Sequence, residues 1–73
     1  MEAQELREKT EQELLELLAS LRKELQKLRV EHRLEGLTDT NVLRAKRRDI
    51  ARIMTVLEEK EILKQIAERE EIN

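Results

Sequence analysis

Large apolar residues recur at alternating spacings of four and three through the first half of the chain. The stripe is made of Leu14, Leu18, Leu21, Leu25 and Leu28, with His32 at the next position. This spacing is typical of the a/d seam of a coiled coil, so it predicts an amphipathic helix with one packing face. Leu17 widens the stripe, whereas Leu15 and Val30 lie off it.

Capping signals set the expected limits of this helix. Thr10 followed three residues later by Glu13 is a capping box, in which the Thr10 hydroxyl accepts a hydrogen bond from the backbone N–H of Glu13. Gly36, the only glycine, can adopt the left-handed conformation that ends a helix. We therefore expect a short arm over residues 1–9, a helix over about 11–34 and a loop over about 35–39.

A second helix is expected over about residues 40–61, with a helical extension up to residue 70. Thr38, Asp39 or Thr40 can each cap its start. Its apolar face comprises Leu43, Ile50, Ile53, Met54 and Leu57. Short connections favour antiparallel helices. The sequence therefore predicts an all-α fold in one domain, 1–73: an antiparallel two-helix coiled-coil hairpin with a short N-terminal arm and a helical C-terminal extension.

The C-terminal extension carries apolar residues that do not fit this seam. On a continuous helix, Ile62, Leu63 and Ile66 lie about 150° around from Leu43. Three placements remain open: they cover the arm through Leu6, they contact a partner, or they stay exposed on a terminal tail.

Composition excludes several classes of function. A chain of 73 residues is too short to bury a large polar pocket, so an enzyme is not expected. With no cysteine, neither a disulfide framework nor a thiolate metal site is available. The first residues lack the apolar core of a signal peptide, and no apolar run approaches the ~20 residues of a membrane span. We expect a cytoplasmic protein without a membrane span.

Charge is concentrated in the second helix. The segment 44–52 contains five basic residues and one acid, Asp49, in a chain whose formal net charge is −2. The five are Arg44, Lys46, Arg47, Arg48 and Arg52, and the first, fourth and fifth of them follow one face at a spacing of four. Guanidinium groups bind phosphates bidentately, so this row is suited to a nucleic-acid backbone.

The basic residues also have interpretations that involve no nucleic acid. The basic residues of the second helix can instead be solvated flanks that pair with the many glutamates of the first helix. Arg29 and Arg33, one turn apart near the end of the first helix, can extend the basic patch toward the loop or simply lie on a solvated face.

Because the chain has no aromatic residue, recognition by base stacking on aromatic rings is unavailable, and backbone or shape recognition is favoured.

The remaining polar residues offer no catalytic or metal site. His32 is the only histidine and has no cysteine or paired carboxylates around it, so we interpret it as a polar residue at the end of the core. Asp49 is most simply a local partner of Lys46 or Arg52, each three residues away. No cofactor is expected.

Several strings of residues are similar to those of a known family. They are Leu6 to Thr10 with Glu13 and Leu14, Glu24 with Leu25, Leu28 with Arg29, Gly36, and above all Arg47 to Ile53 with Thr55 to Leu57. Over roughly residues 4–61 the chain resembles the bacterial-type large-subunit ribosomal proteins numbered twenty-nine. The second-helix string is the specific part of this resemblance.

The resemblance implies an antiparallel helical hairpin bound to large-subunit ribosomal RNA near the polypeptide exit tunnel. It also implies the ribosomal protein numbered twenty-three as a neighbour, and a region used by factors that meet nascent chains. Arg47, Arg48 and Arg52 would then face RNA, with Arg44, Lys46 and Arg29 as helpers. The expected function is that of a structural, ribosome-bound protein.

The chain departs from the family pattern in three respects. Its isoelectric point is about 5.5, whereas the family is usually basic. Glu31 and Glu35 stand in a segment that is usually more neutral, and the tail after Glu61 is longer and more acidic than the resemblance implies. An acidic tail is repelled by RNA and is expected to face solvent or a protein.

The alternative function is a protein-only coiled-coil adaptor that dimerises through the leucine seam or through Ile62, Leu63 and Ile66.

Overall fold

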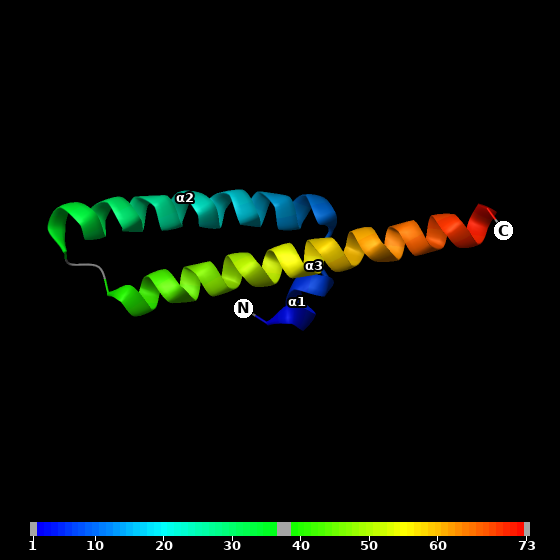
Figure 1. Ribbon diagram of the computed structural model, residues 1–73, viewed down its shortest axis with the longest axis horizontal. Coiled ribbons are helices and arrows are strands. Elements are labelled where there is room, and N and C mark those ends of the chain that lie inside the picture. Colours follow the sequence, from blue (N-terminus) through cyan, green and yellow to red (C-terminus); the bar gives the residue numbers. More distant parts are fainter. Residues whose placement is uncertain (1, 37–38, 73) are drawn as a thin grey trace.

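The structure, a computed structural model, describes residues 2–36 and 39–72, without the side chains of Glu35, Glu70, Glu71 and Ile72. Within these ranges the chain forms three helices and no strand: α1 (Ala3–Arg7), α2 (Glu11–Glu35) and α3 (Thr40–Ile72). The two long helices run antiparallel (Figure 1). The predicted all-α hairpin is therefore confirmed. Its second helix extends to Ile72, beyond the expected limit of residue 70.

The predicted capping residues define the ends of α2. The Thr10 hydroxyl accepts from the Glu13 backbone N–H at 3.1 Å, so the helix begins at Glu11. Gly36 adopts φ +66°, and its N–H donates to the carbonyl of His32 at 2.9 Å. For α3, the Asp39 carboxylate accepts from the Asn41 N–H at 2.9 Å, which identifies Asp39 as the cap among the three expected candidates. Thr38 lies outside the described residues.

The leucine stripe of α2 is buried against α3 as predicted. Leu14, Leu18, Leu21 and Leu25 are buried, and Leu17, Leu28 and His32 are partly buried. Leu15 and Val30, which lie off the stripe, are exposed. Burying a leucine side chain stabilises a fold by about 1.5–3 kcal/mol. This seam is therefore the main source of stability of the hairpin.

The face of α3 that packs differs from the expected one. Leu43 and Ile53 are buried and Ile50 and Leu57 partly so, but Met54 is 48% exposed, which corrects its assignment to the core. On a straight helix, each residue seven positions further along lies about 20° short of a full return to the same side. The apolar stripe of Leu43, Ile50 and Leu57 therefore turns around α3, away from Met54. Val56, which the sequence did not place in the core, is only 2% exposed.

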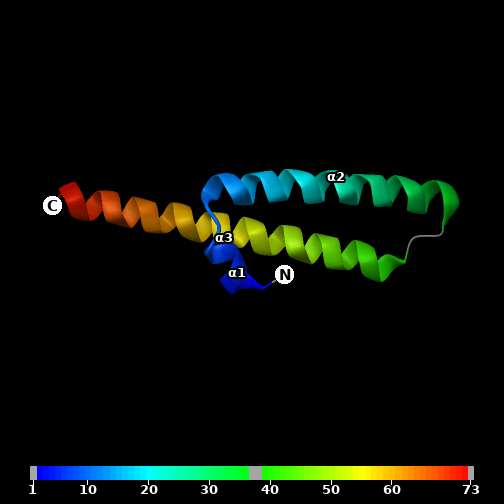
Figure 2. The same ribbon diagram turned by 180° about the vertical axis from the view of Figure 1, so that it is seen from behind.

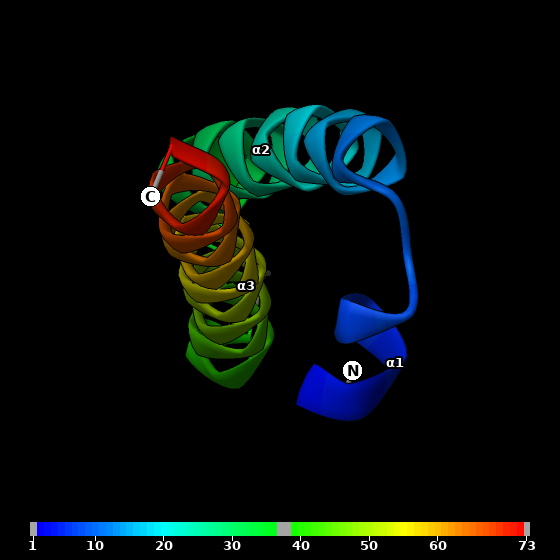
Figure 3. The ribbon, with the colours of Figure 1, turned by 90° about the vertical axis from the view of Figure 1, so that its right-hand side faces the viewer.

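Val56 is buried because α1 covers a second face of α3. Leu6 of α1 is fully buried and belongs to the same apolar cluster as Leu14, Ile53 and Val56. In both broad views α2 follows one edge of α3 and α1 lies at the other edge (Figures 1 and 2). The end-on view shows the extended connection that carries the chain from α1 to α2 (Figure 3). The arm of the sequence analysis is thus a short helix that packs on α3.

The last turns of α3 project past α1 and α2 (Figure 1). We call residues 61–72 the overhang, because Glu59 and Lys60 still contact Arg7 of α1. Ile62, Leu63 and Ile66 are 50%, 65% and 47% exposed there, so they do not cover Leu6. The whole molecule is elongated, with extents of 58 × 17 × 14 Å.

Substitution of Leu14 by alanine tests the seam. Leu14 is fully buried, whereas Leu34 on the same helix is 77% exposed. We expect Leu14→Ala to lower the free energy of unfolding by about 2–5 kcal/mol, the range for buried leucines. Leu34→Ala makes the same chemical change without opening a cavity and should leave stability nearly unchanged. Urea unfolding followed by circular dichroism measures both, and equal effects would contradict the assigned packing face.

Candidate nucleic-acid interface

One side of the seam between α2 and α3 is lined by arginines. Arg22, Arg29 and Arg33 share one face of α2, because spacings of seven and eleven residues return to the same side of a helix. Arg47 of α3 faces them across the seam, and Arg29 and Arg47 together line two adjoining hollows. We call this surface, formed by Arg22, Arg29, Arg33 and Arg47, the arginine groove.

The arginine groove has an apolar floor and a cationic rim. Its two hollows measure about 390 and 430 Å³, and Leu25, Leu43 and Ile50 line them. Gln26 and His32 complete the lining, so no carboxylate borders either hollow among the described residues. Arg22 donates through Nη2 to the sulfur of Met54 at 3.7 Å, which explains why this methionine lies at the groove edge.

The other side of the seam carries mixed charge. Lys46 Nζ lies 2.7 Å from Glu24 Oε2 in an ion pair between α3 and α2. Glu24 also lines a hollow together with Lys27, Leu28 and Glu31. Lys46 and Arg47 are neighbours in sequence, yet they flank the seam on opposite sides. The alternative of pairing with first-helix glutamates therefore holds for Lys46 and fails for Arg47.

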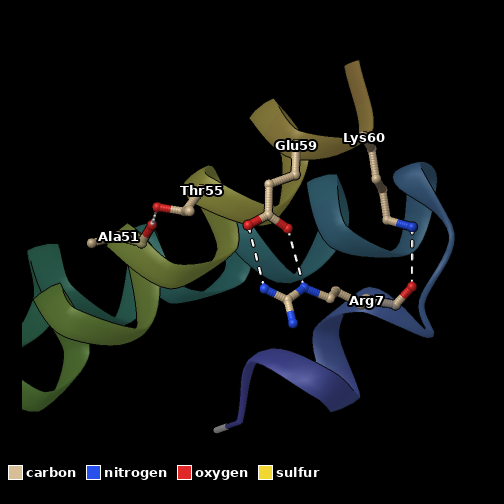
Figure 4. Close-up of polar contacts among 5 residues, drawn as sticks. All are labelled: Arg7, Ala51, Thr55, Glu59 and Lys60. Carbon is tan, nitrogen blue, oxygen red and sulfur yellow. Dashed lines mark hydrogen bonds and ion pairs between the residues drawn. The ribbon is translucent and has the colours of Figure 1, made fainter. Parts of the chain in front are cut away.

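A second basic surface lies between α1 and α3. Arg48 and Arg52 line a hollow of about 210 Å³ together with Arg7 of α1. Arg7 Nε and Nη2 donate to the two carboxylate oxygens of Glu59 at 3.1 and 3.3 Å (Figure 4). This hydrogen bond and the charge of Glu59 raise the pKa of Arg7 above its ordinary value, so the guanidinium stays charged. Lys60 Nζ donates to the Arg7 carbonyl at 3.1 Å and ties α1 further to α3.

The seven residues predicted to bind RNA therefore fall into four environments. Arg29, Arg33 and Arg47 meet in the arginine groove, Arg48 and Arg52 meet at the α1 hollow, Arg44 is exposed one turn before Arg48, and Lys46 is paired with Glu24. Among the side chains that the structure describes, no carboxylate forms an ion pair with Arg29, Arg33, Arg44, Arg47 or Arg48.

Sequence reasoning missed Arg22 and Arg7. The signal for Arg22 was its spacing to Arg29 and Arg33, which is hidden because acidic residues and Lys23 stand nearby in sequence. Arg7 carried only a weak signal, because it stands among Glu5, Glu8 and Glu11 in the arm and its position depends on how α1 packs against α3.

The described residues contain no cluster of histidine, cysteine and carboxylate side chains that fits a metal ion. His32 is partly buried at the edge of the arginine groove, in keeping with its interpretation as a residue at the end of the core. Within the same ranges, no helix is both long and apolar enough to cross a membrane.

Comparison with known proteins decides the family. The model of the ribosomal L29 protein family matches residues 4–60. The chain belongs to this ribosomal protein family. It is therefore a structural protein of the large ribosomal subunit, ribosome-bound in the cytoplasm, and not an enzyme.

Relatives in the L29 family match nearly the whole chain. The large ribosomal subunit protein uL29 of Carboxydothermus hydrogenoformans is 48% identical over 69 residues, which cover 94% of this chain and all of the relative. That of Persephonella marina is 44% identical over 64 residues, 88% of this chain and 94% of the relative. That of Staphylothermus marinus is 45% identical over 62 residues, which cover 85% of this chain and 92% of the relative. No solved structure gives a significant match.

The position of α1 depends on the buried side chain of Leu6. We expect Leu6→Ala to release α1, because the five-residue helix has no comparable second anchor and removal of a buried leucine costs about 2–5 kcal/mol. Hydrogen exchange by NMR should then show the backbone N–H of Lys9, which donates to the Leu6 carbonyl, losing its protection. Amides in the middle of α2 should keep theirs. Leu15→Ala, at an exposed leucine, is the control and should leave α1 protected.

Proposed function

We propose that this L29-family chain binds ribosomal RNA through the arginine groove and the exposed arginines of α3. The observation that supports this most is the gathering of Arg29, Arg33 and Arg47 at hollows bordered by no described carboxylate. Arg44, Arg48 and Arg52 continue the basic surface along α3 toward α1. Lys46 is not part of this surface, because Glu24 balances its charge.

The separation of charge between the two sides explains how a chain of net charge −2 can bind RNA. Affinity for a phosphate backbone depends on the local potential, which falls off over a Debye length of about 8 Å at physiological salt. The groove presents four guanidinium groups, each able to hold a phosphate bidentately. No described carboxylate lines either hollow of the groove, and Glu24 and Glu31 line a hollow of their own on the other side of the seam.

The composition of the overhang suits contact with a protein. Its residues 61–72 include four glutamates and two basic residues, a balance of −2 that disfavours RNA. Its exposed side chains at Ile62, Leu63 and Ile66 suit an apolar protein surface. We propose that the chain lies near the polypeptide exit tunnel with the overhang against the ribosomal protein numbered twenty-three, in the region that nascent-chain factors use.

The alternative function, a protein-only adaptor, finds less support. Dimerisation through the leucine seam would require surface that α3 already covers within the same chain. The overhang remains as an apolar surface, but two copies joined there would bring together two segments of charge −2. A partner of different composition fits the overhang better than a second copy.

Neighbouring substitutions on the two sides of the seam test the RNA-binding surface. Arg47→Gln and Lys46→Gln remove the same charge, yet only Arg47 lies in the arginine groove. We expect Arg47→Gln to weaken binding to large-subunit ribosomal RNA and to reduce the dependence of log K on log salt by about one unit. Lys46→Gln should leave both nearly unchanged. Filter binding at several salt concentrations measures them, and equal losses for the two variants would contradict this surface.

A crosslinking amino acid on the overhang tests the protein contact. At Ile66, on the apolar side, we expect crosslinks to the protein numbered twenty-three in purified large subunits. At Gln65, about 100° around the helix, they should be much weaker. Mass spectrometry identifies the crosslinked chain. Crosslinks from Ile66 mainly to RNA, or to no neighbour, would reject the proposed orientation while leaving the arginine groove untouched.

A further inference from the structure

The hollow between α1 and α3 differs in kind from the arginine groove. Its floor is formed by small or apolar groups, those of Ala3, Ala51, Thr55 and Val56. Its rim carries Arg7, Arg48 and Arg52. At about 210 Å³ it is smaller than the roughly 300–1,000 Å³ of most small-molecule sites. It therefore suits one flat, partly apolar group with negative charge next to it.

Glu59 also lines this hollow, but its charge is already balanced. Both of its carboxylate oxygens accept hydrogen bonds from Arg7, at 3.1 and 3.3 Å (Figure 4). An anion that approaches the rim therefore meets Arg48 and Arg52 beside a neutral pair and not beside a free carboxylate.

The same pair holds the guanidinium of Arg7 in a defined orientation. Two parallel hydrogen bonds fix the plane of an arginine more firmly than one. The backbone of Arg7 is held as well, because Lys60 Nζ donates to its carbonyl at 3.1 Å and Leu6 is buried beside it. A flat cation is thus presented at the edge of an apolar floor.

We propose that this hollow binds a single unpaired nucleotide of ribosomal RNA. The base lies against Ala3 and Ala51 with one face on the Arg7 guanidinium, and the phosphates on either side of it contact Arg48 and Arg52. Unpaired bases stack on arginine planes as well as on aromatic rings, and this chain has no aromatic residue. The proposal rests on the proposed RNA binding and adds to it the class of RNA feature that is recognised.

The chemistry of the floor favours a base over a continuous duplex. A duplex presents phosphates and sugars to a protein surface, and these gain nothing from the methyl groups of Ala3 and Ala51. A base extruded from its stack has an apolar face that does gain from them. The Thr55 hydroxyl donates to the Ala51 carbonyl at 2.9 Å, so its oxygen remains able to accept from an N–H on the edge of a base.

Filling the hollow without touching its charges tests the proposal. Ala51→Leu places a larger side chain on the floor and leaves all three arginines in place. Ala45→Leu, at another exposed alanine of α3 that does not line the hollow, is the matched control. Neither change removes a good helix former, because alanine and leucine both favour helices. A second variant, Arg7→Lys, keeps the charge beside Glu59 and removes the flat guanidinium.

The measurement is chemical probing of ribosomal RNA bases in large subunits that carry each variant or lack the chain. With wild type and Ala45→Leu, we expect one unpaired base to be protected. With Ala51→Leu and Arg7→Lys, that base should become as reactive as in subunits without the chain, while the rest of the footprint persists. In solution, the Kd of Ala51→Leu for the RNA should rise by roughly tenfold, as expected for losing one stacked base.

Two other outcomes have distinct meanings. If all variants give the wild-type footprint, or if wild type protects only paired bases and backbone, the nucleotide site is wrong and the RNA-binding surface stands. If wild type protects no RNA at all, both the nucleotide site and the proposed function are wrong.

Discussion

Burial of the α2 leucine stripe against α3 is the interaction on which the other features of the molecule depend. A leucine seam gains free energy only when a second apolar surface covers it, and α3, which runs antiparallel to α2, supplies that surface within the same chain. This pairing brings Arg29 of the first helix opposite Arg47 of the second. The arginine groove is therefore a consequence of core packing, since neither helix forms it alone.

Segregation of charge follows from the same geometry. A helix that packs through one stripe has two flanks, and residues adjacent in sequence can lie on different flanks because each step turns the helix by about 100°. Lys46 and Arg47 show this directly, one paired with Glu24 and the other facing Arg29. Overall charge is consequently a poor guide to the binding properties of such a hairpin. What matters is which flank each charge occupies.

The sequence predicted the parts of the fold that depend on local signals. Thr10, Gly36 and the leucine stripe act within one helix, and each was placed correctly. Val56 was left out of the core because a single packing face was assumed for α3, whereas α1 covers a second one, and Met54 was misplaced because the apolar stripe turns along the helix. Arg22 and Arg7 were missed for a related reason. Arg22 shares a helix face with Arg29 and Arg33, but which residues of α3 it meets depends on contacts between helices, as does the position of Arg7.

The N-terminal helix α1 shows how contacts between helices can give a short helix a part in a binding surface. Five residues are too few for a stable isolated helix in water, so α1 exists because Leu6 is buried and Arg7 and Lys60 tie it to α3. The α1 hollow is then built from both ends of the sequence, with Ala3 and Arg7 on one wall and residues 48–59 on the other. Any ligand of this hollow must stabilise the docked arm, because undocking removes one wall. Ligand binding to the α1 hollow and the packing of α1 against α3 are therefore thermodynamically linked.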